Sequence, residues 1–138
     1  MLAAITRRSS RFLQARPLVN TRQFATFEKD EDGFVNINSL VEWEAIVAAG
    51  KPVVADFWAP WCGKCTQISG FVTILAEDYP DTFVKLNTAD EGVGPIKAAL
   101  KVEVLPTFRF FNQGKEVDVP VTGYKKGPLK DAVVKLAL

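Results

Sequence analysis

The sequence predicts a mixed α/β domain in which helices lie on both faces of a central sheet. Two observations lead to this fold class. In the first part of the chain, strand-like and helix-like segments alternate, which favours parallel strands joined by helical crossovers. Near the C-terminus, two strand-like segments flank a short turn, which predicts an antiparallel hairpin. A sheet that contains both kinds of pairing is a mixed sheet.

The first predicted strand and helix come before a buried strand. Residues 34–37 (FVNI) have the pattern of a short strand. Ser39 and Glu42 then form a capping box, which marks the start of a helix. This helix runs to about Ala48, and the next glycine closes it. Residues 52–59 (PVVADFWA) form a nearly continuous apolar run, which is typical of a central strand buried on both faces.

A helix follows this strand after a turn that contains both cysteines of the chain. From Cys62 onward, apolar residues recur at helical spacing, so the strand, the turn and the helix form one unit. The apolar positions of this helix are Ile68, Phe71, Val72 and Leu75.

The second half of the chain contains three more strands and two more helices. Residues 82–88 (TFVKLNT) have a strand pattern, and residues 94–101 (GPIKAALK) form a short helix with Pro95 in its first turn. The segments 106–112 and 115–123 alternate apolar and polar residues around the letters NQG, which predicts the hairpin. The last helix, 127–138, starts with Pro128 and has Leu129, Val133 and Leu136 on one face.

The charge of the chain is divided unevenly between two segments. Five of the 17 basic residues lie in an acid-free stretch at the N-terminus, which leaves 12 against 16 acidic residues, or about −4, in the rest of the chain. Because Arg109 is the only arginine in that part, we expect no nucleic-acid partner. No apolar run approaches the ~20 residues that span a bilayer, so we expect no membrane segment.

The N-terminal stretch divides the chain into three parts. Residues 1–24 have the arginine-rich, acid-free composition of a cleavable organelle transit peptide. Residues 22–26 (RQFAT) resemble a mitochondrial processing site, with cleavage after Phe24 and import into the mitochondrial matrix. A plastid peptide of similar composition and a basic tail that stays attached are the alternatives. Residues 25–33 would then be a flexible lead-in, and residues 34–138 the domain.

The two cysteines, Cys62 and Cys65, are three positions apart, a spacing that random placement rarely produces. The chain has no histidine and no third cysteine, so a zinc site would need a second chain or carboxylates, and we expect no metal. An inert buried pair is another alternative, although Gly63 and Lys64 favour an exposed turn. In a redox pair, the helix start favours the thiolate of Cys62, while Cys65 lies one turn deeper and resolves the mixed disulfide.

With this CxxC turn and the strands around it, the chain resembles the thioredoxin family over essentially all of residues 34–138. The resemblance implies the thioredoxin fold. It also implies a thiol–disulfide oxidoreductase without a bound cofactor, which reduces protein disulfides in cell redox homeostasis. The matching stretches are VADFWAPWCGKC (54–65), VKLNTAD (84–90), VLPTFRFF (104–111), NQGKEV (112–117) and the region of Gly123.

The resemblance implies roles for individual residues. Cys62 matches the nucleophile and Cys65 the resolving cysteine. Asp56 matches the buried carboxylate behind the resolving sulfur, and Lys85 the lysine that partners it. An ionised Asp56 in an apolar strand is costly, so its pKa should be raised, which suits a base; a structural salt bridge with Lys85 is the alternative. Pro106 matches the cis-proline that faces the disulfide, where an ordinary trans bond is the alternative.

An apolar rim around the cysteines is expected to bind an extended substrate. Lys64 stands where the family usually has proline, and its charge should stabilise the thiolate of Cys62 and make the pair somewhat more oxidising. The expected substrate-binding residues are Trp61, Gly63, Lys64, Leu105 and Gly123.

The resemblance also implies partners. The expected clients are disulfide-containing proteins, for example of the peroxiredoxin type, and the expected electron donor is a flavin-dependent thioredoxin reductase or an equivalent. Two other functions remain open: a non-catalytic adaptor with the thioredoxin fold, and a more oxidising, isomerase-like oxidoreductase.

Overall fold

The computed structural model describes residues 27–138 and contains the strands and helices predicted above, in the predicted order. One short element was not predicted, the 3₁₀ turn η2 over Glu91–Val93, which leads into α5. The elements are β1 (Val35–Asn36), α3 (Leu40–Ala48), β2 (Val53–Trp58), α4 (Gly63–Asp78), β3 (Phe83–Asn87), α5 (Gly94–Ala99), β4 (Thr107–Asn112), β5 (Lys115–Thr122) and α6 (Lys126–Leu136).

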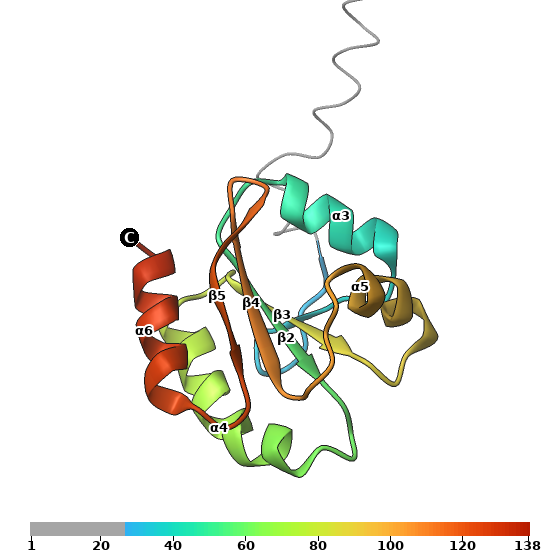
Figure 1. Ribbon diagram of the computed structural model, residues 1–138. Coiled ribbons are helices and arrows are strands. Elements are labelled where there is room, and N and C mark those ends of the chain that lie inside the picture. Colours follow the sequence, from blue (N-terminus) through green and yellow to red (C-terminus); the bar gives the residue numbers. More distant parts are fainter. Residues whose placement is uncertain (1–26) are drawn as a thin grey trace, which may run out of the picture.

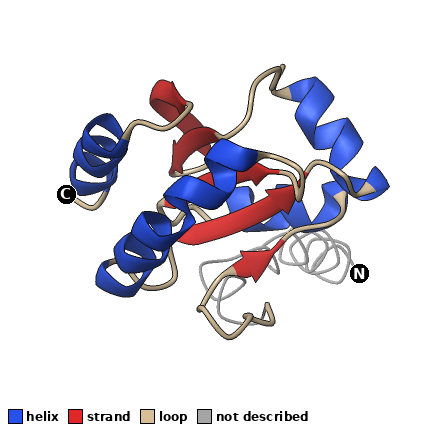
Figure 2. Ribbon diagram, turned by 90° about the horizontal axis from the view of Figure 1, so that it is seen from below, coloured by secondary structure: helices blue, strands red, loops and turns tan. Residues whose placement is uncertain are grey.

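The five strands form one mixed sheet in the order β1-β3-β2-β4-β5. In Figure 1, α4 and α6 cover one face of this sheet, and α3 and α5 cover the other. Figure 2 shows the same arrangement from below, with the helices around the strands. The fold class predicted from the sequence is therefore confirmed.

The strand directions bring several chain segments to one edge of the sheet. β2 is parallel to β3 and antiparallel to β4, and β4 is antiparallel to β5. The C-terminal ends of β2, β3 and β5 therefore lie at the edge where β4 begins, which is the lower edge in Figure 1. The helices that follow β2 and β5, α4 and α6, begin at this edge too.

Alternation along the central strand separates two apolar cores. In β2, Val53, Ala55 and Phe57 pack with side chains of α3 and α5. Val54 packs with side chains of α4 and α6 on the opposite face. Because side chains of a strand alternate between faces, Asp56 lies on the same face as Val54, toward α4.

Local sequence signals set the bounds of the elements. The hydroxyl of Ser39 accepts a hydrogen bond from the backbone N–H of Glu42 at 3.2 Å, which caps α3. The carboxylate of Glu42 accepts one from the backbone N–H of Asn38 at 3.1 Å. In the hairpin, Gln113 and Gly114 have φ values of 53° and 79°, the left-handed conformations that a two-residue type I′ turn requires.

The helices of the described residues were also compared with the length of a membrane-spanning helix. None of the helices within 27–138 has the length and apolar character needed to cross a membrane.

Between β3 and α5, the backbone of Gly92 lies so close to the loop before α3 that a Cβ atom there would overlap the backbone carbonyl of Asn38.

We expect Gly92→Ala to lower the free energy of unfolding by about 2 kcal/mol or more, since the backbone of one of two packed loops must move. Urea denaturation measures this change. Gly70→Ala is the matched control, because a Cβ at Gly70 in α4 meets no atom within 4 Å and alanine favours the helix. Equal stability of the two variants would contradict the close contact at Gly92.

Candidate active site: a disulfide at the start of a helix

The two cysteines lie where β2 gives way to α4, at the lower edge of the sheet in Figure 1. They are joined by a disulfide, with Cα atoms 5.3 Å apart. The backbone N–H of Cys62 donates to the carbonyl of Ala59 at 3.1 Å, so a tight turn connects the strand to the helix. The structure therefore shows the oxidised form of the pair.

The position of Cys62 at the helix start makes the two sulfurs unequal. Cys62 is the N-cap of α4, and its sulfur accepts a hydrogen bond from the backbone N–H of Cys65 at 3.1 Å. Cys62 is half-buried, whereas Cys65 is only 7% exposed and faces the core. N–H groups at a helix start favour negative charge, so they stabilise a thiolate at Cys62 in the reduced form.

The carboxyl of Asp56 lies beneath this pair in the middle of β2. Asp56 is 6% exposed, and burial raises its pKa from 3.8 to about 7, because a carboxylate loses its hydration there. The positive charge of Lys85 opposes this shift and lowers the pKa, but burial has the larger effect. Asp56 therefore changes its charge near neutral pH.

Lys85 is the neighbour of Asp56 in the sheet. The two residues are in register on the parallel strands β2 and β3. The sequence left a structural salt bridge between Asp56 and Lys85 as an alternative, but their charged groups do not form an ion pair. Instead, the ammonium of Lys85 lies 4.4 Å from the ring centre of Phe34 and 5.7 Å from that of Trp58.

A small cavity of about 140 Å³ joins the carboxyl, the lysine and the inner sulfur. Thr66 and Ser69 lie at its more exposed side, and neither was selected from the sequence. Helical spacing gave only part of this signal: Thr66 and Ser69 lie four and seven positions after Cys62 and so share one side of α4, but the spacing does not show that a cavity lies there. The residues around the cavity are Asp56, Trp58, Cys65, Thr66, Ser69 and Lys85.

The segment before β4 lies beside the end of β2. The Leu105–Pro106 peptide bond is cis, so the alternative of an ordinary trans bond does not apply. Thr107 pairs with Phe57, which places Pro106 next to the turn that holds the cysteines. The backbone N–H of Gly123 donates to the carbonyl of Pro106 at 2.9 Å, so the residue that follows β5 is hydrogen-bonded to the cis-proline.

The surface around the cysteines is apolar and accessible. Trp61, the residue before Cys62, is 73% exposed, and Leu105, the residue before Pro106, is half-buried. Val104 and Tyr124, which are 54% and 44% exposed, directly precede Leu105 and directly follow Gly123 in the chain, and they were not selected from the sequence. Gly63 and Lys64 are exposed between the two cysteines. An exposed apolar surface of this kind fits a polypeptide partner.

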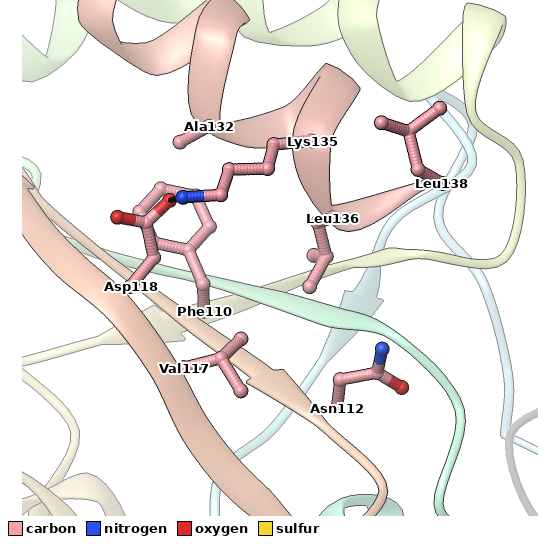
Figure 3. A pocket seen from close by; sticks show the side chains of 8 residues that line it. All are labelled: Phe110, Asn112, Val117, Asp118, Ala132, Lys135, Leu136 and Leu138. Carbon is pink, nitrogen blue, oxygen red and sulfur yellow. Dashed lines mark ion pairs between the residues drawn. The ribbon is translucent and has the colours of Figure 1, made fainter.

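Two other features of the described part lie apart from this chemistry. Within residues 27–138, no three histidine, cysteine, aspartate or glutamate side chains gather into a group that could hold a metal ion. Figure 3 shows a pocket of about 240 Å³ between the hairpin and α6. Its polar lining includes Asn112 and the ion pair of Asp118 with Lys135 at 3.9 Å, but it contains neither cysteine.

Comparisons with known proteins agree on one family. The family model described as Thioredoxin matches residues 35–135. Over 96 residues, the chain is 40% identical to a chloroplastic M-type thioredoxin of Brassica napus, a match that covers 67% of this chain and 53% of that protein. It is 37% identical to a thioredoxin of Porphyra purpurea, with 67% of this chain and 86% of that protein covered. The chain thus spans about half of the Brassica protein and most of the red algal one.

Solved structures support the same assignment. Thioredoxin F from spinach chloroplast is 32% identical, with a TM-score of 0.66 over 75% of this chain and 92% of that one. Oxidised thioredoxin O2 from Arabidopsis thaliana is 28% identical, with a TM-score of 0.67 over 79% of this chain and 98% of that one. Since the family model and the fold agree and Cys62 and Cys65 form the disulfide, the chain belongs to the thioredoxin family and is a dithiol–disulfide oxidoreductase.

Proposed function

We propose that this oxidoreductase works as a protein-disulfide reductase in two steps. The thiolate of Cys62 attacks a client disulfide, which forms a mixed disulfide and releases the first client thiolate. Cys65 then attacks the sulfur of Cys62, which closes the Cys62–Cys65 disulfide and releases the second client thiolate. The client gains two electrons, and the protein ends in the oxidised form that the structure contains.

The order of attack rests on the environments of the two sulfurs. Cys62 is the more exposed and sits at the helix start, where a thiolate is stabilised. Cys65 is nearly buried, so a client disulfide reaches it only with difficulty. It can, however, reach Cys62, since the two sulfurs are bonded in the oxidised form. Burial of Cys65 thus reserves it for the second step.

The shared cavity is the observation that carries the mechanism. Cys65 must lose a proton to become a nucleophile, and the carboxyl of Asp56 lines the same cavity of about 140 Å³. A base works best when its pKa is close to the working pH, and burial raises the pKa of Asp56 to about 7. Lys85, which lowers this pKa, keeps part of the population ionised near neutral pH. We infer that Asp56 takes the proton of Cys65 and that Lys85 tunes it.

The exposed surface around Cys62 would hold the client. Trp61 and Leu105 would supply apolar contacts, and Gly123, whose N–H donates to the carbonyl of Pro106, would leave room for the client because glycine has no side chain. Gly63 and Lys64 lie between the sulfurs, where a client must approach. The ammonium of Lys64 would stabilise the thiolate of Cys62 and so shift the pair toward a more oxidising potential.

The partners follow from the chemistry of the cycle. Thioredoxins act on disulfide-containing proteins, and we propose clients of the peroxiredoxin type. The chain has only two cysteines, so after each turnover the electrons must come from outside. A flavin-dependent thioredoxin reductase, or an equivalent dithiol donor, would supply them. The reaction itself needs no bound cofactor.

The proposed compartment rests on the composition of the N-terminal segment, which lies outside the described residues. We propose that residues 1–24 are a cleavable transit peptide and that the protein works in the mitochondrial matrix. Residues 25–33 then form a lead-in to the domain of residues 34–138. A plastid is the alternative compartment, and it gains support from the chloroplastic thioredoxins of Brassica napus and spinach among the similar proteins.

Cys65→Ser should trap the mixed disulfide with a disulfide-bonded client protein, because the serine cannot attack the sulfur of Cys62. Cys62→Ser should form no stable adduct and reduce no client. Non-reducing electrophoresis and mass spectrometry detect the adduct. Reduction of the client by Cys62→Ser at the wild-type rate would contradict the mechanism, and an adduct through Cys65 in that variant would reverse the order of attack.

Asp56→Asn should raise the free energy of unfolding at pH 8 and slow turnover at pH 7. The folded-state pKa of about 7 lies above the unfolded value of 3.8, so stability of the wild type falls as pH rises between these values and is level above them. At about 1.4 kcal/mol per pKa unit, the variant gains up to about 4 kcal/mol at pH 8. Loss of the base should slow turnover roughly 10-fold or more.

Urea denaturation at pH 4, 6 and 8 and steady-state reduction of a client disulfide measure the two effects. Asp131→Asn makes the same chemical change on the exposed surface of α6 and is the matched control. Parallel pH profiles of stability for wild type and Asp56→Asn would refute the raised pKa. A gain in stability without a loss of rate would leave Asp56 as a buried group with no part in the exchange.

Residues 1–32 fused to a fluorescent protein should direct it to mitochondria, because residues 1–24 have the arginine-rich, acid-free composition of a mitochondrial transit peptide. Microscopy with markers for mitochondria and plastids shows the compartment. Replacement of the five arginines of this segment by glutamine is the control. A diffuse cytosolic signal from the unmodified fusion would contradict import, and a plastid signal would establish the alternative.

A further inference from the structure

The ammonium group of Lys126 is held between two aromatic rings at the start of α6. Its Nζ atom lies 5.4 Å from the ring centre of Tyr124 and 5.6 Å from that of Phe71. Phe71 belongs to α4, so the lysine connects the first turn of one helix to the side of the other. Contacts with two ring faces restrict the side chain and fix the position of its charge.

No carboxylate neutralises this charge within the described part of the chain. The ion pairs of residues 27–138 are those of Lys29 with Asp81, Arg109 with Glu116, and Lys135 with Asp118. The first turns of α4 and α6 contain no acidic residue. Lys64 and Lys125 add two more exposed ammonium groups at the starts of these helices.

Two connections relate the position of Lys126 to that of the cysteines. Tyr124 directly follows Gly123, whose N–H donates to the carbonyl of Pro106. Along α4, Phe71 lies nine residues after Cys62, which corresponds to about 13 Å at 1.5 Å per residue. An extended polypeptide covers this distance with about four residues at ~3.3 Å each.

The acidic residues near the same edge of the sheet lie on the other side. Asp90 and Glu91 are at η2, which contacts α5, and Glu103 lies between α5 and β4. Figure 1 shows α5 on the right of the sheet and α4 and α6 on the left. Lys64, Lys125 and Lys126 therefore lie at the starts of α4 and α6, on the other side of the sheet from Asp90, Glu91 and Glu103.

We propose that Lys126 binds an acidic side chain of the client, about four residues from the client cysteine that Cys62 attacks. The proposal rests on the reductase function above and adds a preference among its clients. The occupant is an extended, disulfide-containing segment with Asp or Glu at that distance. The rings of Tyr124 and Phe71 hold the lysine in place, so less side-chain freedom is lost when the carboxylate binds.

The test compares three synthetic peptides that are dimerised through a single cysteine and carry Glu, Gln or Lys four residues away on both sides. Their reduction is followed with dithiothreitol as regenerating reductant, and kcat/KM is measured at low salt. We expect the wild type to favour the Glu peptide over the Lys peptide by about 2-fold to 5-fold, the range of an exposed ion pair. In 1 M salt the ratio should approach one, because salt screens the charges.

Variants assign the preference to one residue. Lys126→Gln should lower the Glu-to-Lys ratio by about half or more, whereas Lys126→Arg should keep it. Lys130→Gln removes the same charge one turn further along α6 and should leave the ratio at the wild-type value. If Lys126→Gln kept the wild-type Glu-to-Lys ratio, or if the wild type showed no preference between the Glu and Lys peptides, the Lys126 site alone would be overturned. Failure to reduce even the Gln peptide would overturn the reductase function and this site with it.

Discussion

The burial of one carboxyl group, that of Asp56, is the constraint on which the rest of the site depends. An aspartate in the apolar strand β2 loses its hydration, and its pKa rises to about 7 for that reason. The alternation of β2 points it toward α4, where the inner cysteine lies, rather than toward α3 and α5. Burial thus lowers stability at neutral pH and above, and it places a carboxyl that titrates near neutral pH in the same cavity as Cys65, which is the arrangement that the proposed base requires.

The start of α4 places the two cysteines in different environments. A single helical turn separates the two sulfurs, yet Cys62 is at the N-cap and partly open, while Cys65 is covered by the core. A helix start stabilises negative charge on the outer sulfur, whereas the inner cysteine lines a cavity together with Asp56. In the proposed exchange, the two steps would therefore draw on two different sources of electrostatic stabilisation.

Most secondary structure was predictable because its signals are local. The capping box at Ser39, the buried run of β2 and the turn around Gly114 each lie within a few residues, and the structure confirms all three. The 3₁₀ turn η2 was missed, since three residues have no periodicity to detect. Thr66 and Ser69 were missed although the helical spacing after Cys62 was known, because spacing alone does not show that a cavity lies on that side.

The sequence by itself determined the cysteine spacing, the helix that begins at Cys62 and the apolar strand that buries Asp56, because each is a property of neighbouring residues. The tertiary structure decided which groups meet. Register between β2 and β3 places Lys85 beside Asp56, and ring contacts with Phe34 and Trp58 hold its ammonium without an ion pair. Likewise, Lys126 meets Phe71 only because α4 and α6 pack side by side. Such contacts join residues far apart in the chain, and only the packing of whole elements fixes their distances.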